Sequence, residues 1–336
     1  MITRRIRMLV AGTLIAICCK TVSGQGSSSV ILNVNTENSV VYLDDVSDVS
    51  RFATNLNVTA AVVARNFQQS IVMADIVSVN GQPAKGVVLF SIRTINLRTA
   101  PTPGQAIADV MRSNTQSGTF EILSADGTPV GSIMTVGLGG AGPAPAGAPL
   151  AVNQGNNTIV GGTGAFLGAR GQQGQAVTSQ TIGNRQASMT EDPANRRQNG
   201  GGRLQFVLDV IPMFRPEVIL TQGFPSVTHS NGVLVEAQPA RSGEILSLFA
   251  TGLGPTRPGI DPGKTFTANP VQIVNSPVQV TVNGRPAEVL SAVGVPDTVD
   301  TYKVDFLLPA ALGSGPATIQ VTAGFIPGRE FQIPVR

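Results

Sequence analysis

Alternation of apolar and polar positions recurs along the chain and predicts short β-strands. Residues 278–282 read Val-Gln-Val-Thr-Val, in which every second side chain is apolar. This period of two is typical of a strand with one buried face and one solvated face. Apolar runs predict further strands at residues 71–79, 86–97, 118–123, 130–136, 204–211 and 317–323.

Turn-forming dipeptides separate several of these runs. They are Asn80-Gly81, Asp126-Gly127, Asn231-Gly232 and Asn283-Gly284. A two-residue hairpin turn needs positive φ angles, which glycine adopts freely and asparagine or aspartate adopt more easily than most residues. The dipeptides therefore predict antiparallel hairpins. The helix candidate in this pattern is short, at residues 105–112.

Two segments and a pair of prolines mark the breaks in the strand pattern. Residues 137–148 are rich in glycine, alanine and proline, and residues 184–202 are polar and glycine-rich. Both predict long loops. Pro212 and Pro216 stand between the apolar run that ends at residue 211 and the next one, and proline cannot donate a ladder hydrogen bond. We therefore place a domain junction there.

The first 24 residues predict a secretory signal peptide. Arg4, Arg5 and Arg7 precede an apolar stretch at residues 8–19, and small residues at 22–24 precede Gln25. That apolar stretch is too short to span a bilayer. We expect an exported protein, secreted or otherwise extracytoplasmic, with no transmembrane span once the signal is removed. Both cysteines leave with the signal, so no disulfide is expected.

Signal removal also changes the charge. Four of the 23 lysines and arginines lie in the signal, which leaves 19 cations against 20 acidic residues. A nucleic-acid partner is therefore not expected, because such binders depend on clustered excess lysine and arginine. With 38 glycines, 23 prolines and 13% charged residues, the chain suits short strands and tight turns better than long helices.

Residues 158–171 resemble the signature of the dirigent and allene oxide cyclase barrel superfamily. The segment reads Thr-Ile-Val-Gly-Gly-Thr-Gly-Ala-Phe-Leu-Gly-Ala-Arg-Gly, and residues 204–211 are similar to the closing strand of that family. The resemblance implies an eight-stranded antiparallel barrel over residues 25–212, with an apolar cavity that binds or steers a small hydrophobic molecule. The structural positions of this barrel motif are Gly161, Gly162, Gly164, Phe166, Arg170 and Gly171.

Residues 223–336 resemble the Solibacter uncharacterised C-terminal domain family. The stretches that carry this resemblance are residues 243–255, 276–287 and 302–306. That family has no established activity, so the resemblance implies export more than mechanism. The short alternating strands predict an immunoglobulin-like β-sandwich. We expect residues 213–222 to be a linker, and the whole fold to be all-β.

Three features suggest other chemistry and are weighed against simpler readings. The glycines of residues 161–168 lack the spacing, the helix and the βαβ unit of a dinucleotide site. His229 lies next to a turn and is expected to be exposed, without partners for a triad or a zinc site. Asp44, Asp45 and Asp48 could bind calcium, but irregularly spaced aspartates are more often simply solvated. We expect no metal and no cofactor.

Charged residues interrupt apolar strands at four positions and are the candidate ligand-binding residues: Asp75, Arg93, Glu121 and Asp209. If their faces line a barrel cavity, these charges must be paired, and a few polar groups in an apolar pocket can orient a ligand. The alternative is an outward-facing position or a structural ion pair.

Three functional hypotheses follow. The first is a barrel that holds a small hydrophobic ligand, with the C-terminal domain as a surface module for a cell-surface partner. The second is a cyclase or isomerase that uses Asp75 or Glu121 as general base, since folding a substrate in a shaped cavity needs neither metal nor histidine. The third is a structural envelope protein without a cavity.

Overall fold

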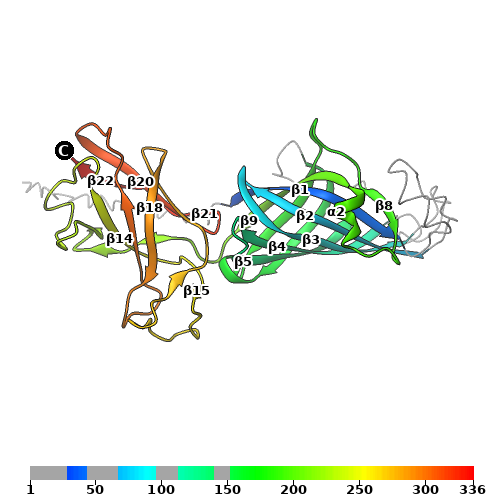
Figure 1. Cartoon of the computed structure of the whole chain (residues 1–336), viewed down its shortest axis with the longest axis horizontal. Coiled ribbons are helices and arrows are strands. Elements are labelled where there is room, and N and C mark those ends of the chain that lie inside the picture. Colours follow the sequence, from blue (N-terminus) through cyan, green and yellow to red (C-terminus); the bar gives the residue numbers. More distant parts are fainter. Residues whose placement is uncertain (1–28, 44–66, 96–112, 140–151) are drawn as a thin grey trace, which may run out of the picture.

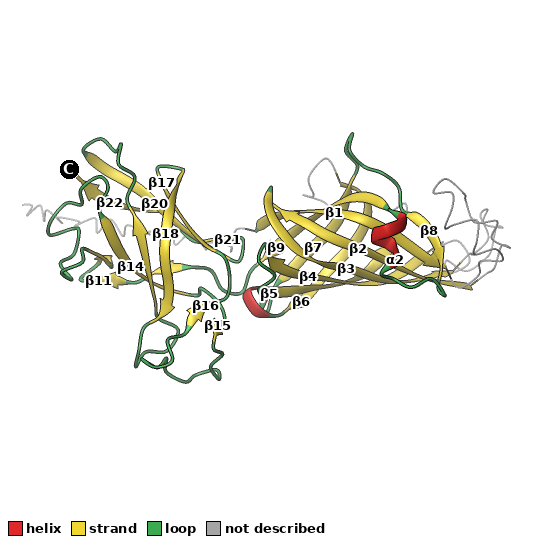
Figure 2. Ribbon diagram, viewed as in Figure 1, coloured by secondary structure: helices red, strands yellow, loops and turns green. Residues whose placement is uncertain are grey.

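The computed structural model describes residues 29–43, 67–95, 113–139 and 152–336. Two β units lie end to end along its long axis (Figure 1). Figure 2 shows that both units are built of strands joined by loops, with short helical segments at residues 164–166 and 195–199 of the first unit. The all-β prediction is therefore confirmed. The predicted signal peptide, the helix candidate at residues 105–112 and the three aspartates at 44, 45 and 48 lie outside the described residues.

Eight antiparallel strands form the first unit. They are β1 (Val30–Leu43), β2 (Phe67–Val79), β3 (Gln82–Ile95), β4 (Ser113–Ser124), β5 (Pro129–Gly139), β6 (Val152–Gly162), β7 (Arg170–Ala176) and β9 (Gly202–Ile211). Each strand pairs with the next in this order, β9 pairs with β1, and β1 pairs with β2. The sheet therefore closes into the predicted eight-stranded barrel.

Tight turns make the hairpins possible. Between β2 and β3, Asn80 has φ 51° and Gly81 has φ 77°, and Asn283 and Gly284 repeat this pattern in the second unit with 49° and 74°. Two successive positive φ angles define the turn whose twist matches that of paired strands. The two-residue turns predicted at Asn80-Gly81 and Asn283-Gly284 are therefore confirmed. At Asp126-Gly127 and Asn231-Gly232 only the glycine has positive φ, so the predicted turn with two successive positive φ angles does not form there.

Aromatic rings fill the middle of the barrel. The ring centroids of Phe90, Phe120 and Phe206 lie 5.2–5.7 Å apart, and the Phe120 ring meets the other two edge to face. Aliphatic side chains from the same strand faces surround them, among them Leu32 and Leu208, both fully buried. Aromatic pairs in this geometry add stabilisation beyond the area they bury. The barrel therefore has a packed core at this level.

The polar segment at residues 184–202 differs from the predicted long loop. It contains the strand β8 (Arg185–Ser188), which pairs in parallel with β1, and the helix α2 (Asn195–Asn199). The pairing of β1 with β9 ends at Ser39, and from residue 40 onward β1 pairs with β8 instead. Ala187 packs there against Tyr42 in a small second core outside the barrel. The loop prediction was wrong because these polar side chains pair with one another, which composition does not reveal.

The second unit begins with β10 (Glu217–Val218). Its other strands are β11 (Leu220–Thr221), β12 (Phe224–Pro225), β13 (Val227–Thr228), β14 (Ile245–Thr251), β15 (Thr256–Arg257), β16 (Ile273–Val274), β17 (Val278–Val282), β18 (Arg285–Gly294), β19 (Tyr302–Leu307), β20 (Gly315–Ala323), β21 (Ile326–Pro327) and β22 (Phe331–Val335). Because β10 pairs with β14, this unit starts within the predicted linker 213–222.

The main sheet of the second unit is curled around its own core. Its order is β10-β14-β19-β18-β17-β20-β21, and β18 pairs with β17 through its first residues and with β19 through its later ones. Leu248, Phe306 and Ile319 are fully buried between the two halves. This curled arrangement is compatible with a sandwich.

Candidate functional site

The junction of the two units contains an open pocket of about 570 Å³. Its walls come from the loop between β6 and β7, from the linker, and from several loops of the second unit. The apolar side chains include Leu167, Phe214, Leu253, Ile260, Phe266 and Ile326. A concave, mainly apolar site of this size is typical of pockets that hold small molecules.

The barrel wall of the pocket is built by the glycine-rich motif. Gly164 opens the 3-10 helix η2 (Gly164–Phe166) with φ 60°, and a Cβ there would lie 2.4 Å from the carbonyl oxygen of Val130. Only glycine allows this close turn. As a result Phe166 points into the barrel and is buried, whereas Leu167 faces the pocket and is 56% exposed.

The opposite wall is built by Gly252, Leu253, Gly254 and Pro255, which follow β14. The Tyr302 hydroxyl donates a 2.7 Å hydrogen bond to the carbonyl oxygen of Gly254 and so fixes this wall. Burial raises the pKa of Tyr302, and nearby Asp300 adds to the shift. The hydroxyl therefore stays neutral and acts as a structural donor.

A turn of the second unit closes the adjacent end of the barrel. Phe325, which follows β20, and Ile326, the first residue of β21, belong to the barrel core cluster together with Val130 and Phe166. Phe325 has φ 68°, a strained value for a bulky side chain. Such a conformation persists only where the surroundings hold it. The apolar end of the barrel therefore anchors this turn.

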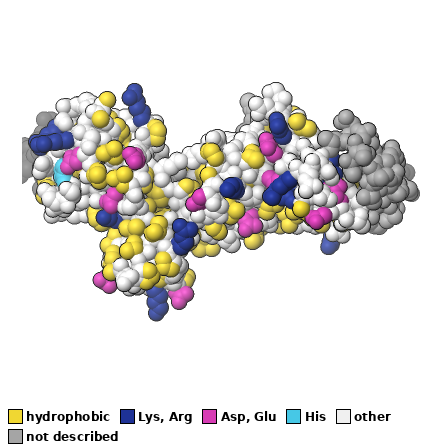
Figure 3. All heavy atoms as spheres, in the orientation of Figure 1, with side chains coloured by type: hydrophobic (Ala, Val, Ile, Leu, Met, Phe, Trp, Pro, Cys, Tyr) yellow, Lys and Arg dark blue, Asp and Glu magenta, His cyan; other side chains and the backbone are white. Residues whose placement is uncertain are grey.

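Charged side chains in the pocket lining are exposed. They are Asp261, Lys264 and Asp300, which flank the apolar walls. Hydrophobic side chains gather over the lobe that carries β15 and β16 (Figure 3). The pocket therefore offers an apolar interior and a polar edge.

The four charges singled out in the sequence all face out of the barrel. In each strand the inward positions alternate with them: Val88 and Phe90 in β3, Phe120 and Ile122 in β4, Leu208 and Val210 in β9. Arg93 and Glu121 are exposed. Asp209 is half-buried, and its Oδ1 atom has no hydrogen-bond partner among the described residues. Arg93, Glu121 and Asp209 therefore occupy the outward-facing positions that the sequence analysis gave as the alternative to a place in a barrel cavity.

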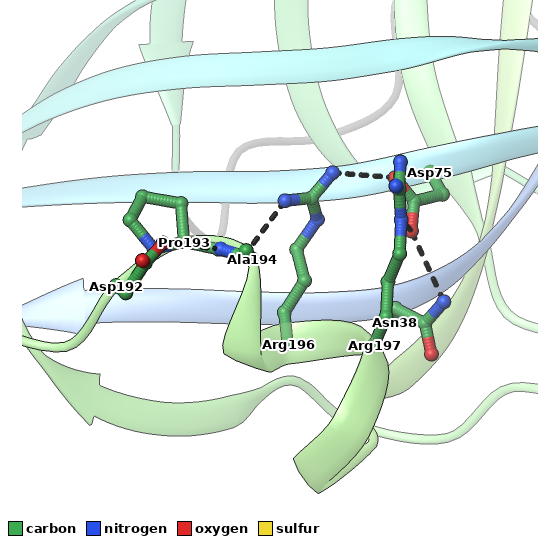
Figure 4. A network of polar contacts seen from close by, with 7 residues as sticks. All are labelled: Asn38, Asp75, Asp192, Pro193, Ala194, Arg196 and Arg197. Atoms are coloured by element: carbon green, nitrogen blue, oxygen red, sulfur yellow. Dashed lines mark hydrogen bonds and ion pairs between the residues drawn. The ribbon is translucent and has the colours of Figure 1, made fainter.

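Asp75 also lies on the outer face, but α2 covers it (Figure 4). Its Oδ1 atom accepts hydrogen bonds from the Nη2 atoms of Arg196 and Arg197, and its Oδ2 atom accepts 3.0 Å bonds from Arg197 Nε and Asn38 Nδ2. Burial alone would raise the pKa of Asp75, but these donors outweigh burial and lower it. Asp75 is therefore a structural anion that ties α2 to β2, and this matches the ion-pair alternative.

The motif glycines have unequal structural roles. A Cβ at Gly171 would lie 1.9 Å from the carbonyl oxygen of Asp209, and one at Gly162 would lie 2.4 Å from that of Phe166. A Cβ at Gly161 would lie 3.9 Å from the Nη1 atom of Arg170, its nearest neighbour in the described part of the chain. Arg170 donates a 2.7 Å hydrogen bond to the carbonyl oxygen of Val160 and so joins the two ends of the loop. The motif therefore shapes the backbone of the barrel.

His229 is buried, which corrects the prediction of an exposed turn histidine. Its side chain is 6% exposed, and its ring nitrogens lie 2.6 Å from the Glu244 carboxylate and 2.7 Å from the carbonyl oxygen of Gln238. Burial opposes the positive charge, but these two acceptors outweigh burial and raise the pKa of His229. The sequence could not show this pair, because fifteen residues separate its members.

The pocket itself was missed by the sequence analysis. Its walls come from segments far apart in the chain, such as Leu167, Phe214 and Val299. The available signal was Phe214, an aromatic residue between two prolines in a predicted linker, and it is 54% exposed. Aromatic side chains commonly line ligand pockets, and such pockets occur preferentially at domain interfaces.

Comparisons with known proteins leave the family open. Neither protein-family models nor curated proteins match the chain.

Among the described residues, no helix has the length and apolar character needed to cross a bilayer. The same residues contain no group of three or more histidine, cysteine or acidic side chains placed to hold a metal ion.

Proposed function

We propose that the protein is an exported, non-catalytic binding protein that holds a small hydrophobic molecule in the pocket between its two units. The observation that carries this proposal is the pocket of about 570 Å³, whose walls are mainly apolar and open to solvent. Pockets that bind small molecules measure roughly 300–1,000 Å³ and combine apolar walls with a few polar groups. Both features occur here.

The junction supports binding better than the interior of the barrel does. Phe90, Phe120 and Phe206 occupy the middle of the barrel, where the family resemblance implied a ligand cavity. We therefore move the proposed site from the barrel interior to the junction and keep the same class of ligand. Export, with the C-terminal unit as the surface or interaction module, remains part of the proposal and rests on the signal sequence.

The cyclase or isomerase alternative has less support. The oxygens of Asp75 are occupied by Arg196, Arg197 and Asn38, and Glu121 is exposed on the outer wall of the barrel. A general base must reach the proton that it abstracts in a bound substrate. Neither carboxylate lines the junction pocket, so neither can serve a substrate bound there.

The test is a titration of residues 25–336 with 1-N-phenylnaphthylamine, a neutral apolar dye that becomes fluorescent in apolar surroundings. We expect saturable binding that the Phe214→Ser substitution weakens by about tenfold, which corresponds to about 1.4 kcal/mol. The matched control is Phe224→Ser, because Phe224 is also exposed, at 44%, and lies outside the pocket lining. Equal dye affinity in both variants would refute the junction as the site.

A structural role in the envelope is the second candidate. Leu89 pairs with Thr119, and Thr119 with Met134, across neighbouring strands of the outer wall. Leu89 and Met134 are 42% and 43% exposed, and Val136 nearby is 51% exposed. Thr119 lies between Leu89 and Met134, so these side chains are grouped on one face of the barrel without forming a continuous apolar patch. Large exposed apolar patches mark interaction surfaces. Absence of dye binding, together with self-association that Met134→Lys abolishes in light scattering, would favour this role.

A further inference from the structure

We propose that the two units separate and dock in solution, and that a ligand in the junction pocket holds them docked. This inference rests on the proposed function, because it concerns the regulation of the same site. The pocket has Leu167 on the barrel side, Phe214 in the linker, and Leu253 and Ile260 on the side of the second unit. It is therefore complete only when the units are docked.

Local contacts hold the docked arrangement. Phe325 and Ile326 enter the end of the barrel, and their turn lies against Ala165 and Val130. Beside them, the side-chain amides of Gln82 and Gln279 donate to each other at 2.9 and 2.7 Å in an exposed position. An exposed polar contact competes with water and adds little stability. Docking therefore depends mainly on one apolar turn.

Other features of the junction oppose docking. Ser276 is buried, and its Oγ atom has no hydrogen-bond partner in the described part of the chain, although it lies close to Gly254 and Gly324. The neighbouring Asn275 Oδ1 atom and the Nη2 atom of Arg215 in the linker are also buried, and neither has a hydrogen-bond partner in the residues that the structure describes. Buried polar atoms without partners favour any arrangement that returns them to water. The strained backbone of Phe325 acts in the same direction.

A ligand that contacts both sides changes this balance. Any molecule that binds only the docked form stabilises that form by mass action. Conversely, the apparent affinity of the pocket for the ligand equals its intrinsic affinity multiplied by the fraction of molecules that are docked, so a smaller docked fraction gives weaker binding. Forced docking should therefore strengthen binding, and binding should make the molecule more compact.

The experiment cross-links the exposed amide pair. Residues 25–336 contain no cysteine, so Gln82→Cys with Gln279→Cys introduces two unique thiols that a short bis-maleimide can join. The control is the same double variant treated with N-ethylmaleimide, which modifies both thiols without joining them. Dye affinity is measured with 1-N-phenylnaphthylamine, and the radius of gyration of the unjoined protein is measured by small-angle scattering with and without the dye.

We expect the cross-linked protein to bind the dye at least threefold more tightly than the control, and the dye to lower the radius of gyration of the control. If the dye binds in a way that depends on Phe214 but both forms have equal affinity and the radius is constant, the docking inference is wrong and the proposed function stands. If neither form binds the dye, both are wrong.

Discussion

A methyl group added at Gly171 is expected to destabilise the barrel strongly. Gly171 lies at the start of β7 with φ 136°, and a Cβ there would lie 1.9 Å from the carbonyl oxygen of Asp209 on the neighbouring strand β9. Real Cβ atoms do not approach a backbone atom so closely. The Gly171→Ala substitution must therefore push β7 away from β9 at the seam where they pair.

Two contributions set the size of the effect. A residue other than glycine in this region of φ costs about 1–3 kcal/mol. Forcing a well-packed structure to accept an extra carbon adds about 1–3 kcal/mol. We therefore expect Gly171→Ala to lower the free energy of unfolding of the barrel by about 2–6 kcal/mol. That is a large share of the roughly 5–15 kcal/mol that stabilises a typical protein.

Gly161→Ala is the matched control, since both glycines belong to the same motif. A Cβ at Gly161 would lie 3.9 Å from Arg170 Nη1, the nearest atom of the described residues, so we expect the free energy of unfolding to change by no more than about 1 kcal/mol. Urea unfolding is followed by the fluorescence of Tyr42 in a Tyr302→Phe background, because each unit contains one of the two tyrosines of the chain. Equal midpoints for the two variants would refute the reasoning.

Two further predictions concern buried charges. Asp75→Asn should lower the free energy of unfolding by about 3–5 kcal/mol in urea unfolding, because it leaves the guanidinium of Arg196 buried without its anion. Arg197→Ala removes a side chain that is 66% exposed and should lower the free energy of unfolding by about 1 kcal/mol or less. A larger loss in Arg197→Ala than in Asp75→Asn would contradict this prediction. The pKa of His229 is raised and that of Glu244 is lowered, so the pair stabilises most between their ordinary values of 6.5 and 4.5. This stability is lost as the pH rises through the raised pKa or falls through the lowered one. Thermal unfolding across pH should show that His229→Gln loses most stability within that window, and a loss independent of pH would disprove it.

The sequence predicted the strands and hairpins of the barrel because turn residues and apolar alternation determine these elements over a few neighbouring residues. Asn80 and Gly81 adopt the positive φ angles that their side chains favour, and the apolar alternation of residues 204–211 places its even-numbered side chains inside. The alternation could not say which face of β2 is inward, because both faces are covered. Ile71 and Met73 pack under β8 outside the barrel, and Asp75 lies on their face.

The missed features depend on contacts between distant segments. The strand β8 and the helix α2 are held by pairs such as Arg185 with Glu191 and Arg197 with Asp75, and glycine-rich composition hides such pairing. The pocket arises only when Leu167 and Ile260 meet at the junction. The alternation of apolar and polar residues along the chain does not predict how the two units are oriented relative to each other.

Closure of the barrel by Phe325 limits how the chain can be divided. A fragment that ended at Ile211 would expose Val130, Ala165 and Phe166 at one end, because the turn that covers them belongs to the other unit. Exposed apolar surface of this kind promotes aggregation. A chain without the second unit is therefore expected to aggregate more readily than the whole protein, in which the turn can return to the end of the barrel, although both units have cores of their own.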